Sequence, residues 1–374
     1  MSIKHYIKNR IQDIAKENVK LLIKLAILSC TNQLFGQTTI SFTNTTNIGQ
    51  TNVEFFDKER GRPIITELWY PTTDSIKETD NTFSPLVREL TIRNGKLPVK
   101  KYPLIMISHG NGGNRLSLEW LAQHLVQSGY VVAAVDHWGN THNNKIGIEF
   151  VKPWERPLDI SFSLTKLLGN KNFKAMINED KIGALGFSYG GYTVLALAGA
   201  VINYDILLEY YNTPKGKKEI NSIPEFPNLS VQLNNPALIE MMRCIPNLKD
   251  KRFKAFFAIS PGTAMGFNKR KQFQEIHSPV YIIGTESDNI TPVDSYARKY
   301  HKLIVHSEYY EFKGKAGHYI MLAEANDKLK KEDPVLFTDH PSVNRKKVHL
   351  KVSELSVSFF NQKLHLNQEI TFSK

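Results

Sequence analysis

The sequence contains only two cysteines, Cys30 and Cys244, among its 374 residues. So few cysteines exclude a disulfide-rich scaffold and a zinc site built from four thiolates. Long hydrophobic runs are also missing, because no stretch reaches the ~18 apolar residues of a transmembrane helix, and this excludes a multi-pass membrane protein. Hydrophobic residues still make up 41% of the chain, which is enough for a substantial buried core.

The chain also lacks a concentrated basic patch. It has 48 basic and 36 acidic residues, a net charge of +12, and such a balance can favour binding to nucleic acid or to an anionic surface. The short basic runs, however, lie far apart and have no interleaved aromatic residues of the kind that single-strand binders use. These runs are Lys100–Lys101, Lys215 with Lys217–Lys218, Lys269–Lys271 and Arg345–Lys347. We therefore expect a solvated basic surface and no nucleic-acid partner.

Residues 1–36 have the order of a secretory signal peptide. Basic residues come first, an apolar stretch from Leu21 to Cys30 follows, and small and polar residues lead to Gly36. One expectation is cleavage after Gly36. The other is a lipoprotein-type signal, because Ile27–Cys30 resembles a bacterial lipoprotein box in which Cys30 is acylated. We predict export to the periplasm, to the cell exterior or to a lipid anchor at the outer membrane; the alternative is an amphipathic helix in a cytoplasmic protein.

The rest of the chain alternates between short apolar runs and segments with helical spacing. Residues 37–52, rich in Thr, Asn and Gly, are expected to form a flexible lead-in. Residues 53–56 and 66–70 flank a turn and predict a hairpin. Further strands are expected at 104–107, 131–135, 182–185, 255–259, 280–283 and 308–312, and helices at 116–125, 158–168, 192–201, 293–301 and 348–364. This alternation predicts an α/β fold over 53–374, with a mostly parallel central sheet and helices on both faces.

Residues 202–251 interrupt this alternation with several prolines among Asn and apolar residues. Connections of this length are usually lids or binding segments, so we predict a cap insertion over the carboxyl edge of the sheet. Its apolar side chains either line a substrate pocket or only attach the cap to the core. The candidates are Tyr204, Leu207, Leu208, Tyr210, Tyr211, Leu238, Met241 and Met242.

The strongest chemical signal is the segment Gly186-Phe187-Ser188-Tyr189-Gly190, which follows an expected strand and opens an expected helix. G-x-S-x-G in this context is typical of a nucleophile elbow. Glycines are needed at both ends because a side chain there would collide with the neighbouring strand and helix. Ser188 is therefore the candidate nucleophile, and the alternative is a glycine-rich turn with an incidental serine.

A second glycine-rich turn, residues 109–113, follows the strand expected at 104–107. We predict that the backbone N–H groups of Asn111 and Tyr189 form an oxyanion hole. The alternative, a phosphate-binding loop, requires a glycine spacing that this turn lacks. His109 itself is expected to be a structural hydrogen-bonding residue.

The acid and the base are expected at the ends of two later strands. Asp288 comes just after the strand at 280–283, and His318 comes after the strand at 308–312. The order Ser, Asp, His along the chain is that of enzymes with a G-x-S-x-G elbow. Glu286 and Asp294 are rival candidates for the acid, whereas Asp136 precedes the serine and is expected to be structural.

Together these segments resemble the α/β-hydrolase superfamily, and within it the bacterial predicted dienelactone hydrolases and the platelet-activating-factor acetylhydrolase-like esterases. The resemblance extends over about residues 53–362 and rests on residues 57–71, 107–113, 128–137, 139–141 and 186–191. It implies a serine ester hydrolase that acts on a small-molecule or lipid ester. No metal or organic cofactor is required for this chemistry.

Two departures from the family pattern refine this expectation. True dienelactone hydrolases use a cysteine nucleophile, so Ser188 argues against their substrate. Plasma-type acetylhydrolases carry their acid after the strand that here ends in Ser260-Pro261-Gly262, where no carboxylate is present. This again points to Asp288. The alternatives are a serine peptidase of the prolyl-oligopeptidase type and a catalytically inactive binding protein on the same fold.

Overall fold

The computed structural model describes residues 46–78, 83–222 and 226–364. The expected signal peptide, including Cys30 and Gly36, lies outside the described residues, and so does most of the expected lead-in. Export and lipid anchoring therefore stay predictions. The second cysteine, Cys244, is free and exposed.

The expectation of a flexible lead-in up to residue 52 is wrong at its end. Asn47–Asp57 forms one continuous strand, β1, which pairs antiparallel with β2, Arg62–Thr72, along its whole length. The polar residues of β1 can be buried because distant side chains satisfy them. Gln50 donates to Glu67 at 2.9 Å and accepts a hydrogen bond from Thr91 at 2.5 Å.

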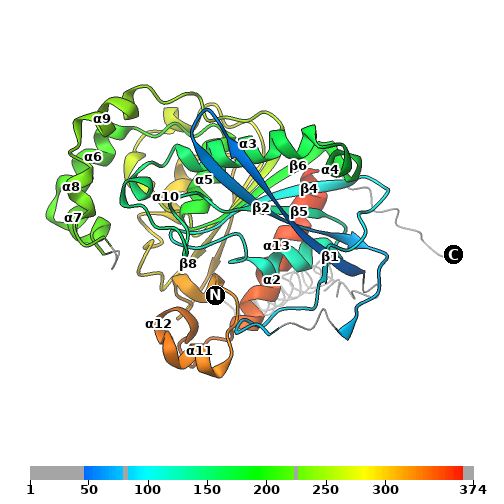
Figure 1. The fold of residues 1–374 in the computed structure, drawn as a ribbon. Coiled ribbons are helices and arrows are strands. Elements are labelled where there is room, and N and C mark those ends of the chain that lie inside the picture. Colours follow the sequence, from blue (N-terminus) through cyan, green and yellow to red (C-terminus); the bar gives the residue numbers. More distant parts are fainter. Residues whose placement is uncertain (1–45, 79–82, 223–225, 365–374) are drawn as a thin grey trace, which may run out of the picture. The chain divides into compact units, whose positions relative to one another are not determined.

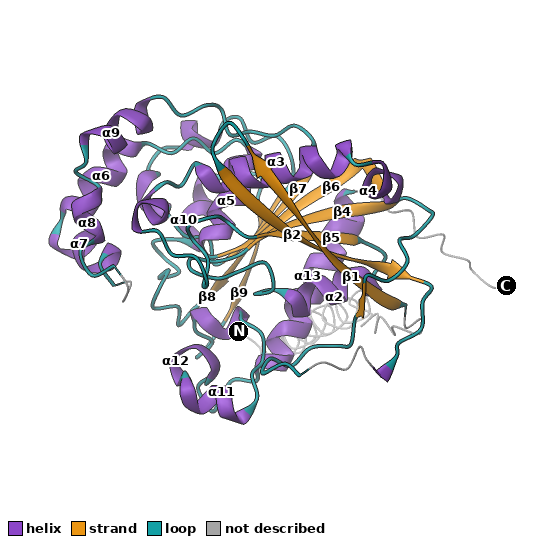
Figure 2. Cartoon of the chain, viewed as in Figure 1, coloured by secondary structure: helices purple, strands orange, loops and turns teal. Residues whose placement is uncertain are grey.

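Nine strands form one sheet in the part of the chain that the structure describes, in the order β3-β1-β2-β5-β4-β6-β7-β8-β9. The remaining strands are β3 Ile92–Arg93, β4 Tyr102–Ser108, β5 Val131–Val135, β6 Ile177–Phe187, β7 Phe253–Ile259, β8 Val280–Thr285 and β9 Glu308–Phe312. The pairs β1–β2 and β2–β5 are antiparallel, and the other pairs are parallel. The predicted α/β class with a mostly parallel sheet is confirmed (Figure 2).

Both faces of the sheet are buried, as its continuous apolar strands indicate. In β5 the side chains of Val131, Ala133 and Val135 enter one hydrophobic cluster, whereas Val132 and Ala134 enter a second cluster on the opposite face. Helices α3 Glu155–Gly169, α4 Lys171–Met176, α5 Tyr189–Ala198 and α10 Ala297–Leu303 contribute to the first cluster. Helices α2 Glu119–Gln127 and α13 Arg345–Lys363 contribute to the second (Figure 1).

Several local details differ from the sequence-based expectation. Helix α2 begins at Glu119 and not at 116, because Asn114 and Ser117 form a hydrogen-bonded turn before it. Short helical segments were not predicted, since a few residues carry no clear periodicity. They are η2 Gly147–Val151, η3 Ala264–Gly266, η4 Arg270–Phe273, η5 His318–Met321, α11 Asp327–Glu332 and α12 Pro334–Phe337.

The segment 202–251 is largely helical where it is described. It contains α6 Tyr204–Asn212, α7 Pro214–Ile220, α8 Leu229–Gln232 and α9 Pro236–Arg243. Two of its prolines, Pro214 and Pro236, begin α7 and α9, a position where proline costs no hydrogen bond. At its end the segment returns to the place where it began, the end of α5. There Asp250 N donates a hydrogen bond to Leu197 O at 3.0 Å.

Apolar contacts and one carboxylate attach this segment to the sheet-bearing part of the fold. Leu229, Leu233, Leu238 and Met242 form one hydrophobic cluster with Phe150, Val151 and Trp154, which follow β5. Glu219 of α7 accepts hydrogen bonds from Tyr210 of α6 and, at 2.5 Å, from Tyr296 just before α10. Among the candidate lining residues, Leu207, Leu238 and Met242 are buried in clusters, which favours attachment over pocket lining for these three.

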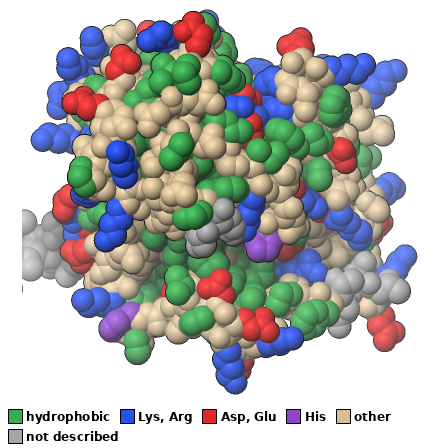
Figure 3. Space-filling model, turned by 60° about the vertical axis from the view of Figure 1, so that its left-hand side comes forward, with side chains coloured by type: hydrophobic (Ala, Val, Ile, Leu, Met, Phe, Trp, Pro, Cys, Tyr) green, Lys and Arg blue, Asp and Glu red, His purple; other side chains and the backbone are tan. Residues whose placement is uncertain are grey.

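No helix among the described residues is long and apolar enough to span a bilayer. Lys and Arg side chains are scattered among acidic and apolar ones on the face drawn in Figure 3.

A buried ionic cluster joins the β1–β2 hairpin to α3. The carboxylate of Asp159, which has no exposed surface, lies 2.9 Å from Arg60 Nη1, 3.1 Å from Arg62 Nη2 and 3.0 Å from His137 Nδ1. Burial, reinforced by the nearby arginines, holds the pKa of His137 well below 6.5. His137 is therefore neutral. Its Nδ1 donates a hydrogen bond to Asp159, and its Nε2 accepts one from the hydroxyl of Ser108, 2.9 Å away.

We predict that Asp159→Asn lowers the free energy of unfolding by about 3–5 kcal/mol, because it leaves buried guanidinium groups without their counter-charge. Urea denaturation at neutral pH measures this loss. Asp180→Asn, at an exposed position, is the control and should change stability by less than about 0.5 kcal/mol. Equal effects of the two substitutions would contradict the prediction.

Candidate active site

Ser188 occupies a sharp turn between β6 and α5. Its backbone has φ 57° and ψ −118°, a conformation that non-glycine residues rarely adopt. A Cβ atom on Gly186 would lie 2.0 Å from the carbonyl oxygen of Gly190, and a Cβ on Gly190 would lie 2.0 Å from that of Ser108. Both glycines are thus needed for this close approach, as the sequence pattern predicts.

Hydrogen bonds hold the turn from the side of β7. Ser188 N donates to Ile259 O at 2.8 Å, and Ser188 O accepts from the N–H of Gly191 and of Gly262, each at 2.8 Å. Strained residues of this kind persist only where the surroundings determine their conformation, and they concentrate at functional sites.

The structure brings the three predicted side chains together. Ser188 Oγ lies 3.0 Å from His318 Nε2, and His318 Nδ1 lies 2.7 Å from Asp288 Oδ2. Ser188 follows β6, Asp288 follows β8, and His318 lies in the loop after β9, so all three stand at the carboxyl edge of the parallel strands. Their exposed fractions are 9%, 5% and 3%, which keeps the hydrogen bonds largely out of water.

Thr291 fixes the Asp288 carboxylate. Its N–H donates to Oδ1 at 2.6 Å and its hydroxyl donates to Oδ2 at 2.8 Å, while the N–H of Ile290 adds a third bond at 2.9 Å. Burial alone would raise the pKa of Asp288, but the hydrogen bond and charge of His318 and the bonds from Thr291 outweigh it. The pKa of Asp288 therefore lies below 3.8.

Sequence reasoning missed two residues that position the base and the acid. The bond from Ile290 N to Asp288 is an Asx turn, and Thr291 is the residue that follows this turn. An Asp followed closely by a Thr was the signal available in the sequence. Phe187 packs its ring 4.8 Å from the ring of His318. Its role depends on a contact between distant parts of the chain, which no local pattern encodes.

The N–H groups of Asn111 and Tyr189 both lack a hydrogen-bond partner within the described part of the chain. In the loop around Asn111, the N–H of Gly112 donates to Asn140 Oδ1 at 3.1 Å and that of Gly113 to Gly110 O at 3.2 Å. The N–H groups of Gly112 and Gly113 therefore already have acceptors. The two N–H groups predicted for the oxyanion hole remain available.

The other residues considered for the acid and the base have different partners. Glu286 accepts from Gly314 N at 2.7 Å, and Asp294 is 80% exposed and pairs with Arg298 at 2.6 Å. Asp136 accepts from the backbone and the side chain of Arg115, as expected of a structural residue. His109 is buried and bonded to Gly110 O and to the N–H of His137, and burial lowers its pKa well below 6.5.

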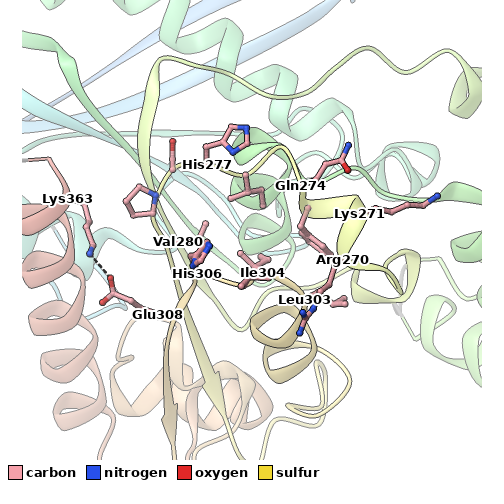
Figure 4. A pocket seen from close by; sticks show the side chains of 15 residues that line it. Arg270, Lys271, Gln274, His277, Val280, Leu303, Ile304, His306, Glu308 and Lys363 are labelled. Atoms are coloured by element: carbon pink, nitrogen blue, oxygen red, sulfur yellow. Dashed lines mark ion pairs between the residues drawn. The ribbon is translucent and has the colours of Figure 1, made fainter.

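A hollow of about 720 Å³ lies away from these side chains (Figure 4). It is bordered by Val280 and Glu308, the first residues of β8 and β9, so it opens at the amino edge of the sheet, opposite Ser188. The ion pair between Lys363 and Glu308, 2.9 Å long, crosses part of it. Among the described residues, no group of His, Cys, Asp and Glu side chains is placed to hold a metal ion.

Two comparisons with known proteins bear on the fold and on the class of enzyme. A family model described as platelet-activating factor acetylhydrolase, isoform II, matches residues 76–146, a stretch that includes β4, the loop 109–113, α2 and β5 and ends before Ser188. The solved structure of a ferulic acid esterase from Streptomyces cinnamoneus is similar to this chain, with a TM-score of 0.57 and 16% sequence identity, over 86% of this chain and 92% of that one.

The structural likeness confirms the predicted α/β-hydrolase fold. Together the two comparisons support a serine esterase of α/β-hydrolase type and therefore a carboxylic ester hydrolase, the enzyme class predicted from the sequence.

We predict that Asp288→Asn removes a pH-dependent part of the stability. Because the pKa of Asp288 is lowered in the folded state, its contribution is complete above the unfolded-state pKa and disappears as the pH falls through the folded-state pKa, below 3.8. The difference in unfolding free energy between wild type and variant should shrink as the pH falls from 5 to below 4. Urea denaturation across this range tests it, and a constant difference would contradict it.

Proposed function

We propose that the protein is a serine hydrolase that cleaves carboxylic esters through an acyl-enzyme intermediate. The observation that carries this proposal is the hydrogen-bonded line from Ser188 Oγ through His318 to Asp288, at 3.0 and 2.7 Å. A serine hydroxyl is a weak nucleophile at neutral pH unless an adjacent base accepts its proton.

In the first step Ser188 Oγ attacks the ester carbonyl carbon, and its proton passes to His318 Nε2. The carbonyl oxygen becomes an oxyanion, which the N–H groups of Asn111 and Tyr189 stabilise. Asp288 keeps Nδ1 protonated and stabilises the charge that develops on the imidazole. The tetrahedral intermediate then collapses, the bond to the alcohol oxygen breaks, and the alcohol leaves with the proton from His318.

In the second step water replaces the alcohol. His318 accepts a proton from the water as its oxygen attacks the acyl carbon, and the same N–H groups hold the second oxyanion. Collapse of this intermediate releases the carboxylic acid and returns the proton from His318 to Ser188. Every proton that leaves a nucleophile thus returns to a leaving group through one imidazole.

The proposed substrates are small-molecule or lipid esters. The description of the matched family names an acetylhydrolase and the similar structure is a ferulic acid esterase. Both names denote cleavage of an ester. We therefore place ester hydrolysis before the serine peptidase alternative.

We predict that the full chain hydrolyses p-nitrophenyl esters and that Ser188→Ala lowers kcat by roughly 10⁴–10⁶-fold. A series from acetate to palmitate, with methyl ferulate beside it, measures the acyl preference. A fluorophosphonate should label wild type on Ser188, which peptide mass spectrometry detects.

Substitution of the acid supplies the matched comparison. Asp288→Asn should lower kcat by about 10⁴-fold because it favours the wrong imidazole tautomer, whereas Glu286→Gln and Asp294→Asn should retain activity. Ester hydrolysis that survives in Ser188→Ala would overturn the proposal. Labelling of Ser188 without any ester hydrolysis would favour the peptidase, to be assayed with proline-containing peptides.

A further inference from the structure

We infer that Asn140 is a positioning residue for the oxyanion hole, and that the buried guanidinium of Arg156 orients it. This inference rests on the proposed function. Asn140 is 1% exposed, and both polar atoms of its side chain are used. Oδ1 accepts from Gly112 N at 3.1 Å and from Arg156 Nη1 at 3.0 Å, and Nδ2 donates to Asn111 Oδ1 at 2.8 Å.

Asn140 holds the Asn111 side chain and also the N–H of Gly112, the residue that follows Asn111. The preceding peptide is held separately, because Gly110 O accepts from His109 Nδ1 at 2.6 Å and from Gly113 N at 3.2 Å. In a trans peptide the C=O and the N–H point in opposite directions. Holding Gly110 O on one side therefore directs the N–H of Asn111 to the other.

The loop needs such external support because of its composition. Three of its five residues, 109–113, are glycines, which lose the most conformational freedom on folding. Gly112 has φ 64°, and nothing lies within 4 Å of where its Cβ would be, so local packing does not restrict it. Without Asn140, the N–H of Gly112 would lose the acceptor that holds it in the structure.

A tight turn after β5 places Asn140 opposite the loop. Asn140 N donates to His137 O at 2.9 Å, and Gly139 has φ 75°. A Cβ on Gly139 would lie 2.5 Å from the side chain of Glu149, so this turn requires glycine. Glycine at 139 thus allows the turn that brings Asn140 to the loop.

Arg156 of α3 connects Asn140 to both halves of the proposed oxyanion hole. Its guanidinium donates to His109 O, at the start of the loop, and lies 4.7 Å from the centre of the Tyr189 ring. Its third partner is Thr193 Oγ1 in α5, at 3.3 Å. The same group thus contacts Tyr189, which carries one of the two free N–H groups, and His109, which lies two residues before Asn111.

Arg156 also brings a buried positive charge to this position. It is 1% exposed, and the carboxylate of Asp159 attracts it through space, whereas its direct hydrogen-bond acceptors are neutral oxygens. Burial lowers the pKa of Arg156 to about 9, which leaves it protonated at neutral pH. A buried positive charge favours negative charge that develops nearby, since the interior screens it weakly.

The test compares Asn140→Ala with Asn140→Asp. Alanine removes all three hydrogen bonds, and the loss of one well-placed oxyanion donor lowers kcat about 10²–10³-fold. Aspartate keeps an oxygen for Gly112 N and Arg156, and the amide of Asn111 can turn to donate to it. We expect Asn140→Asp to restore kcat to within about 10-fold of wild type, and we expect KM to stay within about 3-fold in both variants.

A matched control separates positioning from stability. Thr66→Val removes a buried hydrogen bond, 2.8 Å long, between Thr66 of β2 and Ser163 of α3. Neither of these two side chains takes part in the contacts of Asn140. It should lower the urea midpoint comparably to Asn140→Ala and leave kcat within about 2-fold of wild type. Inhibition by phenylboronic acid, whose tetrahedral adduct with Ser188 places an oxygen in the hole, should weaken in Asn140→Ala in parallel with kcat.

A readout independent of activity is amide hydrogen exchange at Gly112, which should be slow in wild type and faster in Asn140→Ala at pH 7. Wild-type kcat in Asn140→Ala, or equal kcat losses in Asn140→Ala and Thr66→Val, would overturn the inference while leaving the esterase intact. A wild type that fails to hydrolyse any ester and does not react with fluorophosphonate would instead overturn the proposed function, and the catalytic role of Asn140 with it.

Discussion

The site depends on how closely the backbone of α5 approaches the end of β4. Gly190 lies so near the carbonyl of Ser108 that any side chain at this position would overlap with it. This contact sets two segments against each other: the turn that presents Ser188 and the loop, residues 109–113, that follows β4. The strained backbone of Ser188 is then fixed by hydrogen bonds from the neighbouring strand. Because the strands are parallel, their carboxyl ends bring Asp288 and His318 to the same edge.

Much of this arrangement was predictable from the sequence, because the informative residues sit at strand ends. Continuous apolar runs marked the buried strands, and Ser188, Asp288 and His318 each follow one of them. The structure places these three side chains within hydrogen-bonding distance. The short spacing from Asp288 to Thr291 also carried a usable signal.

What the sequence did not reveal depends on contacts between residues far apart in the chain. The sequence of the first half of β1 is polar and therefore predicts a loop. It forms a strand because Glu67 and Thr91 supply hydrogen-bond partners for the buried side chain of Gln50. The bond from Arg156 to the carbonyl of His109 joins residues 47 positions apart. Likewise, the prolines of residues 202–251 interrupt the sequence pattern and hide its helices, although Pro214 and Pro236 begin two of them. In each case the local pattern was ambiguous and the tertiary partner decided the outcome.

The cap, residues 202–251, leaves the fold and returns to it at one place, where Asp250 bonds to the end of α5. A segment whose ends already meet can be lengthened, shortened or exchanged at a small cost in loop-closure entropy. Ser188 lies before this segment, and Asp288 and His318 lie after it, so none of them has to move when it changes. Evolution can therefore vary the cap separately from the chemical machinery, and a designer can graft a different cap between the same two anchor points.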